Sequence, residues 1–213
     1  AAYGLKTTQT QTNYLYNGLV DLQWSVVNAD LGIAYFDHEF TRTNPKNGEK
    51  TTDTIRYGYD SVTPKDPTIT DGAVSDIFIT GQLFSDGYYS WTVTTYNAKN
   101  SKSNKIKPYE FVVDTVRPTT VTVKGEGYEP IVAVRDVFLT WGASADLFGI
   151  KNYEVQYRAA RGDNSGWQQL VKVTDPKAQL INFDDGDGTY QYRVYAYDNN
   201  GNRSLVSENG TFV

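Results

Sequence analysis

His38 is the only imidazole among the 213 residues, so it is the first side chain to consider for acid–base chemistry. Asp37 and Glu39 flank it in the sequence and resemble an acid–base cluster. In a β-strand, however, successive side chains point to opposite faces, so these carboxylates should lie away from the imidazole. A catalytic triad also needs an activated nucleophile, and the sequence contains no nucleophile-elbow motif. We therefore predict a half-buried core histidine, hydrogen-bonded to a Tyr or Thr hydroxyl, in a protein that is not an enzyme.

Arg161, Gly162 and Asp163 form an Arg-Gly-Asp tripeptide, the motif through which adhesive proteins engage integrins. The tripeptide lies in a segment rich in turn residues, between the strand around Tyr153 and Trp167. Gly, Asp and Asn tolerate positive φ, so a turn at this place explains the same residues without a receptor. Integrin binding through Asp163 is an alternative hypothesis.

Outward-facing aromatic residues are candidates for a binding surface that stacks against sugars. Tyr195 and Tyr197 share the outward face of one predicted strand, and Trp167 follows the turn-rich segment. Aromatic rings in these positions also pair across strands with the aliphatic stems of residues such as Lys151 or Arg158. The sequence therefore leaves two interpretations, a protein or glycan ligand and ordinary cross-strand packing.

The elements that must position these residues occur twice in the chain. Segment 87–97 aligns with segment 188–198 at a shift of 101 residues, and Ser103 aligns with Ser204. In both copies an Asp-Gly turn precedes a strand whose large side chains alternate with polar ones. A repeat of about 100 residues is too long for a solenoid unit, so each copy should build its own core.

A second register supports the duplication. Segment 19–40 aligns with segment 136–157 at a shift of 117 residues, which places Trp24 over Trp141. The two shifts differ by 16 residues, and the additional residues fall between about 42 and 80. They predict an enlarged middle hairpin in the first copy, followed by a Pro-bearing edge segment.

The pattern as a whole predicts an all-β protein of two tandem antiparallel β-sandwich domains. Strands recur every 8 to 12 residues between turn residues, and no segment carries a sustained helical stripe. The expected boundaries are 1–114 for the first module with its enlarged hairpin, 115–119 for a linker, and 120–213 for the second module. The predicted cores comprise Trp24, Phe36, Phe40, Tyr89, Trp91 and Val93 in the first module, and Trp141, Tyr153, Val155, Tyr157, Tyr192 and Val194 in the second.

These strands resemble fibronectin type III modules, and more narrowly the fibronectin-like and Ig-like modules of bacterial surface and secreted proteins. The resemblance rests on the Trp strand, the Gly-Ile-x-x-aromatic strand, and the Gly-x-Tyr-x-aromatic-x-Val strand with its Asn-rich loop. It implies that Trp24 and Trp141 are core residues, and that Tyr89 and Tyr190 are corner tyrosines whose hydroxyls bond back to the preceding loop. The first module departs from the pattern through its 16 additional residues and through Asn100, which replaces a glycine in the Asn-rich loop.

In such modules an integrin-binding tripeptide is carried by the loop after the sixth strand, which here is 199–203. The tripeptide at 161–163 therefore lies on a different loop, at the opposite end of the sandwich. What the resemblance implies about function is a role class, because these modules act as spacers, adhesive units or supports for catalytic domains.

Oxygen-bearing side chains are expected to converge at the junction between the modules. Asp114 leaves the first module there, and sandwich topology places the loops around Asp146 and around Asp198 and Asn200 at the same end of the second module. Carboxylate and amide oxygens are the ligands that Ca²⁺ prefers, so these four residues form a candidate calcium site. A solvated polar junction is the other interpretation, and no other cofactor is expected.

Composition narrows the function classes. The absence of cysteine excludes disulfides, thiolate catalysis and Cys-based zinc sites. A net charge of -5 with scattered basic residues argues against nucleic acid, and no apolar run is long enough to insert into a membrane. We predict a non-catalytic structural or adhesive module pair of a bacterial extracellular or cell-surface protein, acting as a spacer or a binding surface beside neighbouring modules of the same polypeptide. The alternative is an accessory, carbohydrate-binding region of a secreted protease or glycoside hydrolase.

Overall fold

A computed structural model describes residues 2–27, 32–58, 74–123, 136–160, 166–180, 183 and 185–212. The chain divides into two compact units, Ala1–Thr115 and Val116–Val213, and the division falls at the start of the predicted linker. All regular structure in these ranges is β-strand, with antiparallel pairing throughout, which confirms the predicted all-β class. No helix in the described ranges could cross a bilayer. The predicted Pro-bearing edge segment, with Pro64 and Pro67, lies outside the described residues.

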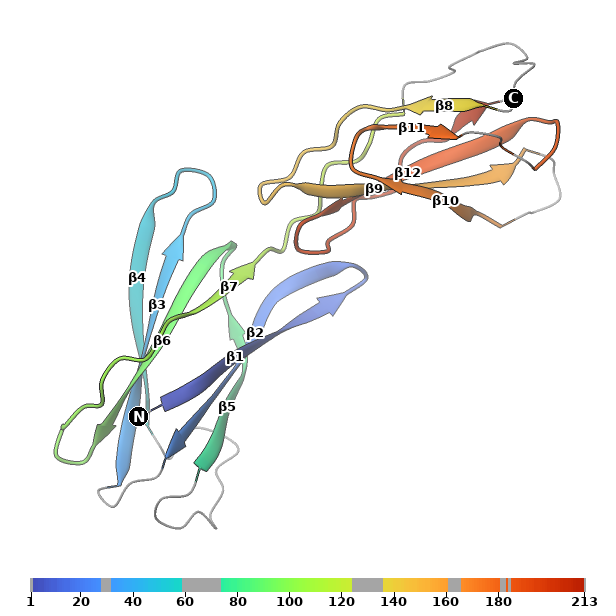
Figure 1. Cartoon of the computed structure of the whole chain (residues 1–213). Helices are drawn as coiled ribbons and strands as arrows, with labels where there is room; N and C mark the ends of the chain where they lie inside the picture. The colour runs from blue at the N-terminus through green and yellow to red at the C-terminus, as the bar shows by residue number, and fades with distance from the viewer. Residues whose placement is uncertain are drawn as a thin grey trace. The chain divides into compact units, whose positions relative to one another are not determined.

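The first unit is a sandwich of a three-stranded and a four-stranded sheet (Figure 1). One sheet has the order β1-β2-β5 and the other the order β4-β3-β6-β7. The strands are β1 (Ala2–Thr12), β2 (Leu15–Val27), β3 (Ile33–Thr43), β4 (Lys50–Gly58), β5 (Val74–Leu83), β6 (Gly87–Asn97) and β7 (Tyr109–Val113).

The core of the first unit lies between these two sheets because alternate residues of each strand face inward. On β2, Val20, Leu22, Trp24 and Val26 are buried between half-buried polar neighbours. All six predicted core residues of this unit are buried. Trp24, from the three-stranded sheet, packs edge-on against Phe36 of the facing sheet, with ring centroids 5.3 Å apart.

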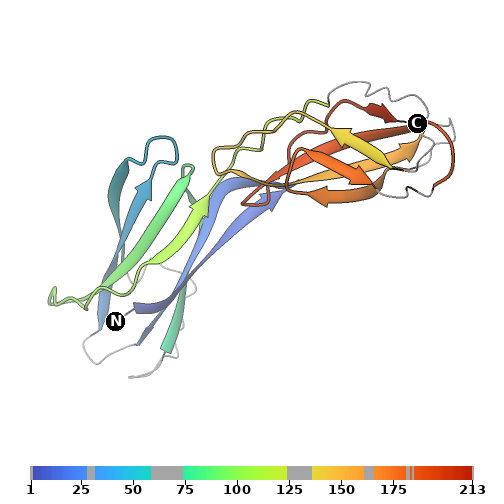
Figure 2. The same cartoon turned by 45° about the horizontal axis from the view of Figure 1, so that its top comes forward.

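The second unit repeats this plan with shorter strands. Its larger sheet has the order β10-β9-β12-β13, and β11 pairs with β8 in the facing layer (Figure 2). An isolated bridge between Val123 and Trp141 extends that layer. The strands are β8 (Val137–Thr140), β9 (Ile150–Ala159), β10 (Gln168–Val173), β11 (Lys177–Leu180), β12 (Tyr190–Asp198) and β13 (Gly210–Phe212).

The core of the second unit contains five of its six predicted residues in fully buried positions. Tyr157 differs, because it is half-buried at the edge of the core and its hydroxyl bonds to the Asp185 carboxylate. That bond, together with burial, raises the pKa of Tyr157 to about 12. In the first unit, the predicted enlargement includes a longer hairpin arm, since β4 has 9 residues and its counterpart β10 has 6.

The repeat detected in the sequence is also a repeat of hydrogen bonds. Ser103 Oγ accepts the N–H of Thr95 at 3.2 Å, and Ser204 Oγ accepts the N–H of Ala196 at 3.0 Å. Both serines therefore pin the chain that follows the loop against the end of the preceding strand. The predicted corner tyrosines lie near the start of the equivalent strands β6 and β12. Their role is confirmed, because the Tyr89 hydroxyl donates to Ser85 O and the Tyr190 hydroxyl to Asp185 O, both at 2.7 Å.

Asn100 of the first unit adopts the same left-handed backbone conformation as Gly201 of the second unit. Both residues have positive φ, 61° and 96° respectively. Asn is among the few non-glycine residues that adopt this left-handed conformation readily. The replacement noted in the sequence therefore leaves the loop geometry intact.

Candidate functional site

His38 lies at the centre of the first unit's core rather than at a solvent-accessible site. It is fully buried on β3, among the rings of Trp24, Tyr57 and Trp91. Asp37 and Glu39 point to the opposite face, as the alternation predicted, where they pair with basic side chains on the outside of the sheet. The residue is thus sealed from any substrate in solution.

The burial and the hydrogen-bond partner of His38 both differ from the prediction, since the ring is fully buried and not half-buried. The donor is the indole Nε1–H of Trp91, 3.1 Å from His38 Nδ1, and the expected Tyr or Thr hydroxyl is not its partner. Because Nδ1 accepts this bond, the ring proton resides on Nε2, a buried atom that has no hydrogen-bond partner within the described ranges. Burial lowers the pKa of His38 to about 3, against a small opposing effect of Asp37. The imidazole is therefore neutral at physiological pH and serves as a core residue.

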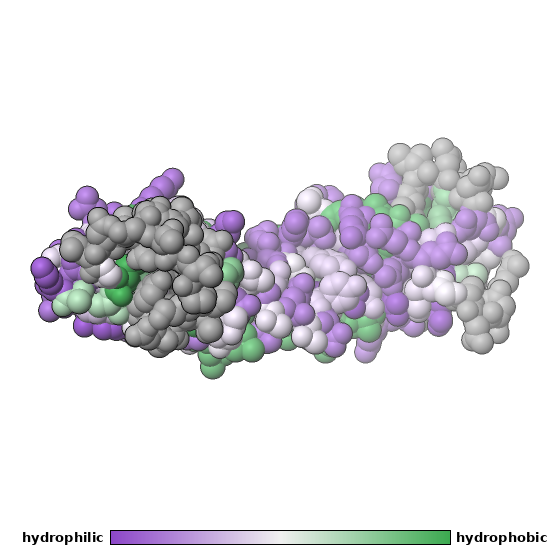
Figure 3. Space-filling view, turned by 90° about the horizontal axis from the view of Figure 1, so that it is seen from below, coloured by the Kyte–Doolittle hydropathy of each residue, from purple (hydrophilic) through white to green (hydrophobic). Residues whose placement is uncertain are grey.

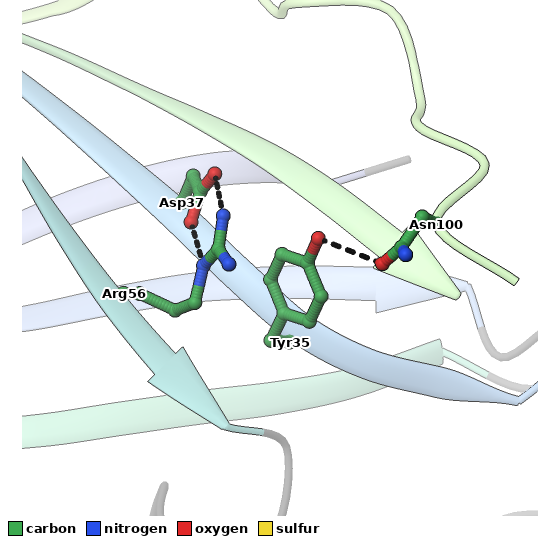
Figure 4. A network of polar contacts seen from close by, with 4 residues as sticks. All are labelled: Tyr35, Asp37, Arg56 and Asn100. Atoms are coloured by element: carbon green, nitrogen blue, oxygen red, sulfur yellow. Dashed lines mark hydrogen bonds and ion pairs between the residues drawn. The ribbon is translucent and has the colours of Figure 1, made fainter. Parts of the chain in front are cut away.

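The outer face of the first unit's four-stranded sheet carries a cluster of charged and aromatic side chains (Figure 4). Arg56 of β4 donates two hydrogen bonds to the carboxylate of Asp37 on β3, at 2.7 and 2.8 Å. The Arg56 guanidinium also lies 3.9 Å from the ring centroid of Tyr35, and this ring stacks on Tyr96 at 4.6 Å. The Tyr35 hydroxyl donates to Asn100 in the loop after β6. The cluster links three strands and a loop through half-buried and exposed side chains.

The second unit repeats this arrangement at equivalent positions. Glu154 of β9 forms an ion pair with Lys172 of β10 at 3.3 Å, and the Tyr197 hydroxyl of β12 donates to Glu154 at 3.1 Å. Burial alone would raise the pKa of Glu154, but hydrogen bonds from Gln156, Tyr197 and Lys172 outweigh it and lower the pKa. Glu154 is thus held as a carboxylate. An acidic residue on the central strand, a basic residue on the edge strand and a tyrosine on the other neighbour are common to both units.

A row of arginines and aromatic rings continues across this face of the second unit. Arg158 and Arg193 lie 4.6 and 4.3 Å from the ring centroid of Trp167. Arg193 and Arg203 lie 5.5 and 4.3 Å from that of Tyr195. The prediction from the sequence included both rings and Arg158 as a cross-strand partner, but not Arg193 or Arg203. The available signal was Arg193, two residues before Tyr195 and therefore on the same face of β12.

These cation–π contacts change the interpretation of the aromatic residues as a sugar platform. Tyr195 is only 9% exposed, and Trp167 is half-buried, so neither ring is freely presented to solvent as the outward strand positions suggested. A sugar would have to displace a guanidinium from a ring before stacking on it. On the face shown in Figure 3, hydrophilic residues cover most of the described surface and hydrophobic ones form only small groups.

One end of the second unit brings two of the predicted metal ligands together. Asp146 lies in the loop before β9 and Asp198 at the end of β12, and one carboxylate oxygen of each lies within 4.8 Å of the other. The two loops are tied by Asn199, whose N–H donates to Gly149 O at 3.1 Å and whose side chain donates to Phe148 O at 2.8 Å. The topological expectation that these loops meet is therefore confirmed.

The remaining predicted site residues are placed as follows. Asn200 lies in the same loop as Asp198 and donates its backbone N–H to the Asp198 carboxylate. Asp114 is a buried residue of the first unit, and its role as a ligand stays a prediction. The tripeptide at 161–163 falls outside the described residues, so integrin binding also stays a prediction.

A shallow depression in the second unit lies where β8 and β11 approach β10. Its volume is about 650 Å³, and Phe138, Thr140, Lys172, Asp175 and Gln179 are among its lining residues. Its charged lining residues Lys172, Asp175 and Lys177 are exposed, so they do not form the enclosed set of polar groups that usually fixes a small ligand. We assign no chemistry to it.

Comparison with known proteins places the fold. The sequence matches no family model and no curated protein sequence. The structure is similar to domains A168-A170 from titin, with a TM-score of 0.50 and 17% identity over 98% of this chain and 66% of that one. Both units have a fibronectin type III-like or Ig-like β-sandwich fold. The strand orders, the buried tryptophans and the corner tyrosines agree with this assignment.

Two further structures are similar over most of the chain. The chicken CNTN1 FN1-FN3 domains have a TM-score of 0.43 and 15% identity over 92% of this chain and 60% of that one. The Clostridium thermocellum CbhA fibronectin(III)-like modules have a TM-score of 0.39 and 15% identity over 90% of this chain and 83% of that one. The chain thus spans less than two thirds of the titin and CNTN1 chains. Likeness at these identities concerns the fold alone.

Proposed function

We propose that this chain is a non-catalytic module pair of a bacterial extracellular or cell-surface protein, where it acts as a spacer or presents a binding surface. The observation that carries the proposal is the duplication: each unit has its own core, core tryptophan and corner tyrosine, so each is built as a self-contained module. The only imidazole of the chain, that of His38, is buried in the core of the first unit. Modules of this fold commonly serve as connecting or adhesive units.

The outer faces of the four-stranded sheets are the surfaces that such a module would present. In both units these faces are polar, charged and cross-linked by ion pairs and cation–π contacts. A surface whose groups already satisfy one another suits a spacer that remains soluble beside other modules. It also suits recognition of a charged partner that exchanges contacts with the arginines.

The alternative is an accessory region of a secreted protease or glycoside hydrolase that binds carbohydrate. It depends on Trp167, Tyr195 and Tyr197, the aromatic residues on or next to the outer face of the second unit. The guanidinium groups over Trp167 and Tyr195 disfavour it, because sugar stacking needs a free ring face. A second alternative is an adhesin that binds integrin through Asp163.

A binding screen with the full chain distinguishes these functions. The spacer proposal expects no saturable binding to a glycan array and no turnover of peptidase or glycosidase substrates. Glycan binding that is lost in Trp167→Ala, and retained in the control variant Tyr88→Ala on the first unit, would establish the carbohydrate alternative instead. Cell attachment that is abolished by Asp163→Glu would establish the integrin alternative. Turnover of any substrate would contradict a non-catalytic role.

A further inference from the structure

The second unit contains a buried carboxylate, that of Asp198, of which only one oxygen accepts hydrogen bonds from the described residues. Asp198 is 0% exposed. Its Oδ1 accepts the backbone N–H groups of Asn200 at 2.8 Å and Asn202 at 2.9 Å, and these bonds hold the loop in place. Its Oδ2 is buried and has no hydrogen-bond partner among the residues that the structure describes. An ionised oxygen in this situation is costly unless a positive charge compensates it.

The first unit shows that the loop itself does not need this charge. Asn97 is the equivalent of Asp198 in the repeat, and its Oδ1 accepts the N–H groups of Lys99 at 3.0 Å and Ser101 at 2.9 Å. A neutral amide therefore caps the same loop with the same pair of bonds. The hydrogen bonds of the loop therefore do not account for the additional oxygen and the negative charge of Asp198.

A second carboxylate lies beside the first. Asp146 has an oxygen within 4.8 Å of an Asp198 oxygen, and its Oδ1 accepts the N–H of Phe148 at 2.7 Å. Two carboxylates at this separation repel each other, and a cation between them removes the repulsion. Both groups are held by backbone bonds in loops that Asn199 ties together, so their separation is built into the fold.

We propose that the second unit binds a Ca²⁺ ion through Asp146 and Asp198. Ca²⁺ fits these groups because it prefers hard oxygen ligands and accepts irregular geometry, with waters or carbonyl oxygens completing its coordination. Mg²⁺ fits less well because it demands near-ideal octahedral geometry and gives up water reluctantly. With two carboxylates the affinity should fall in the range of extracellular modules, a Kd of about 0.1–1 mM. The proposal uses only residues of the second unit and does not depend on the proposed function.

A calcium titration of the full chain, followed by amide signals in ¹H–¹⁵N NMR spectra, tests the proposal. The reporters are the amides that bond to the two carboxylates, those of Phe148, Asn200 and Asn202. We expect saturable shifts of these signals with a midpoint of about 0.1–1 mM, and weaker shifts with Mg²⁺. At ten times the Kd, calcium should also raise the Tm of the second unit by about 5–10 °C.

Substitutions decide whether the response arises at this site. Asp198→Asn copies the residue of the first unit, so the loop should keep its fold while the calcium shifts disappear. Asp146→Asn should have the same effect and decides the matter if Asp198→Asn fails to fold. Asp175→Asn makes the same charge change at an exposed position of the second unit and should leave the titration unchanged. The absence of saturable shifts up to about 10 mM Ca²⁺, ten times the upper Kd, or their persistence in both site variants, would overturn the proposal.

Discussion

Acidification should destabilise the first unit through His38 and leave the second unit, which has no histidine, without this effect. The folded-state pKa of about 3 lies below the ordinary value of 6.5. As the pH falls below 6.5, His38 therefore binds a proton in the unfolded chain but stays neutral in the folded unit. The stability that neutral His38 provides is present above pH 6.5 and is lost progressively down to about pH 3.

The magnitude follows from the two pKa values. Relative to about pH 8, linkage predicts that the free energy of unfolding of the first unit falls by about 2 kcal/mol at pH 5 and by about 3 kcal/mol at pH 4. For a unit of this size, 2 kcal/mol corresponds to a decrease in Tm of roughly 8–16 °C. The charged groups near the ring do not cancel this loss, because Asp37 opposes the effect of burial only in part, and burial raises the pKa of the Tyr57 hydroxyl, which stays neutral.

The assay is thermal and denaturant unfolding between pH 8 and pH 4, read separately for each unit from indole N–H signals. The Trp91 Nε1–H signal reports on the first unit, since this group donates to His38, and the Trp141 signal reports on the second. The variant His38→Gln keeps a neutral acceptor for Trp91 at every pH. It should be less stable at neutral pH, and the first unit should then follow the second in its response to acid.

Two results would refute this reasoning. One is a first unit no more sensitive than the second between pH 6.5 and pH 4. The other is a His38→Gln variant with the same pH dependence as the wild type, which would assign the acid response to carboxylates instead.

Two substitutions in the second unit, Trp141→Ala and Gly149→Ala, test its packing, and each has a control variant. Trp141→Ala should lower the free energy of unfolding by about 3–5 kcal/mol because the ring is buried. The control Phe138→Ala, at a residue that is 68% exposed, should lower it by less than about 0.5 kcal/mol. Equal effects of the two substitutions in chemical denaturation would contradict the assignment of Trp141 to the core. Gly149→Ala should cost about 1 kcal/mol more than Gly32→Ala, since both residues have positive φ but only at Gly149 would a Cβ atom meet another group, 2.8 Å from the Asn199 side chain. Equal losses of stability in the two variants would show that the hydrogen bonds of Asn199 between the loops do not contribute to the free energy of unfolding.

The strands and the cores could be predicted because their signals are local, whereas the corner tyrosines followed from the resemblance to fibronectin type III modules. Alternation along 20–26 and along the repeated strands assigns each side chain to a face, and a pattern found twice is unlikely to be coincidental. The same alternation correctly predicted that the Asp37 and Glu39 side chains point away from His38.

The errors concern contacts between residues that are distant in the sequence. The hydrogen-bond partner of His38, Trp91, is 53 residues away in the sequence. Alternation could therefore predict that the imidazole faces the core, but not whether an indole or a hydroxyl donates to it. The position of Arg193 over Trp167 depends on the register that pairs Arg193 with Gln156, and the sequence does not specify this register. Tyr157 was expected to be fully buried, but its hydroxyl reaches Asp185 at the edge of the core.

The account rests most directly on the autonomy of the two units, which separate expression of residues 1–115 and 116–213 would measure. We predict that each polypeptide folds by itself and gives a dispersed ¹H–¹⁵N NMR spectrum, in which the signals of its core residues match those of the full chain. A half that remains unfolded alone, or whose core signals move throughout, would contradict the description of the chain as two self-contained β-sandwich modules.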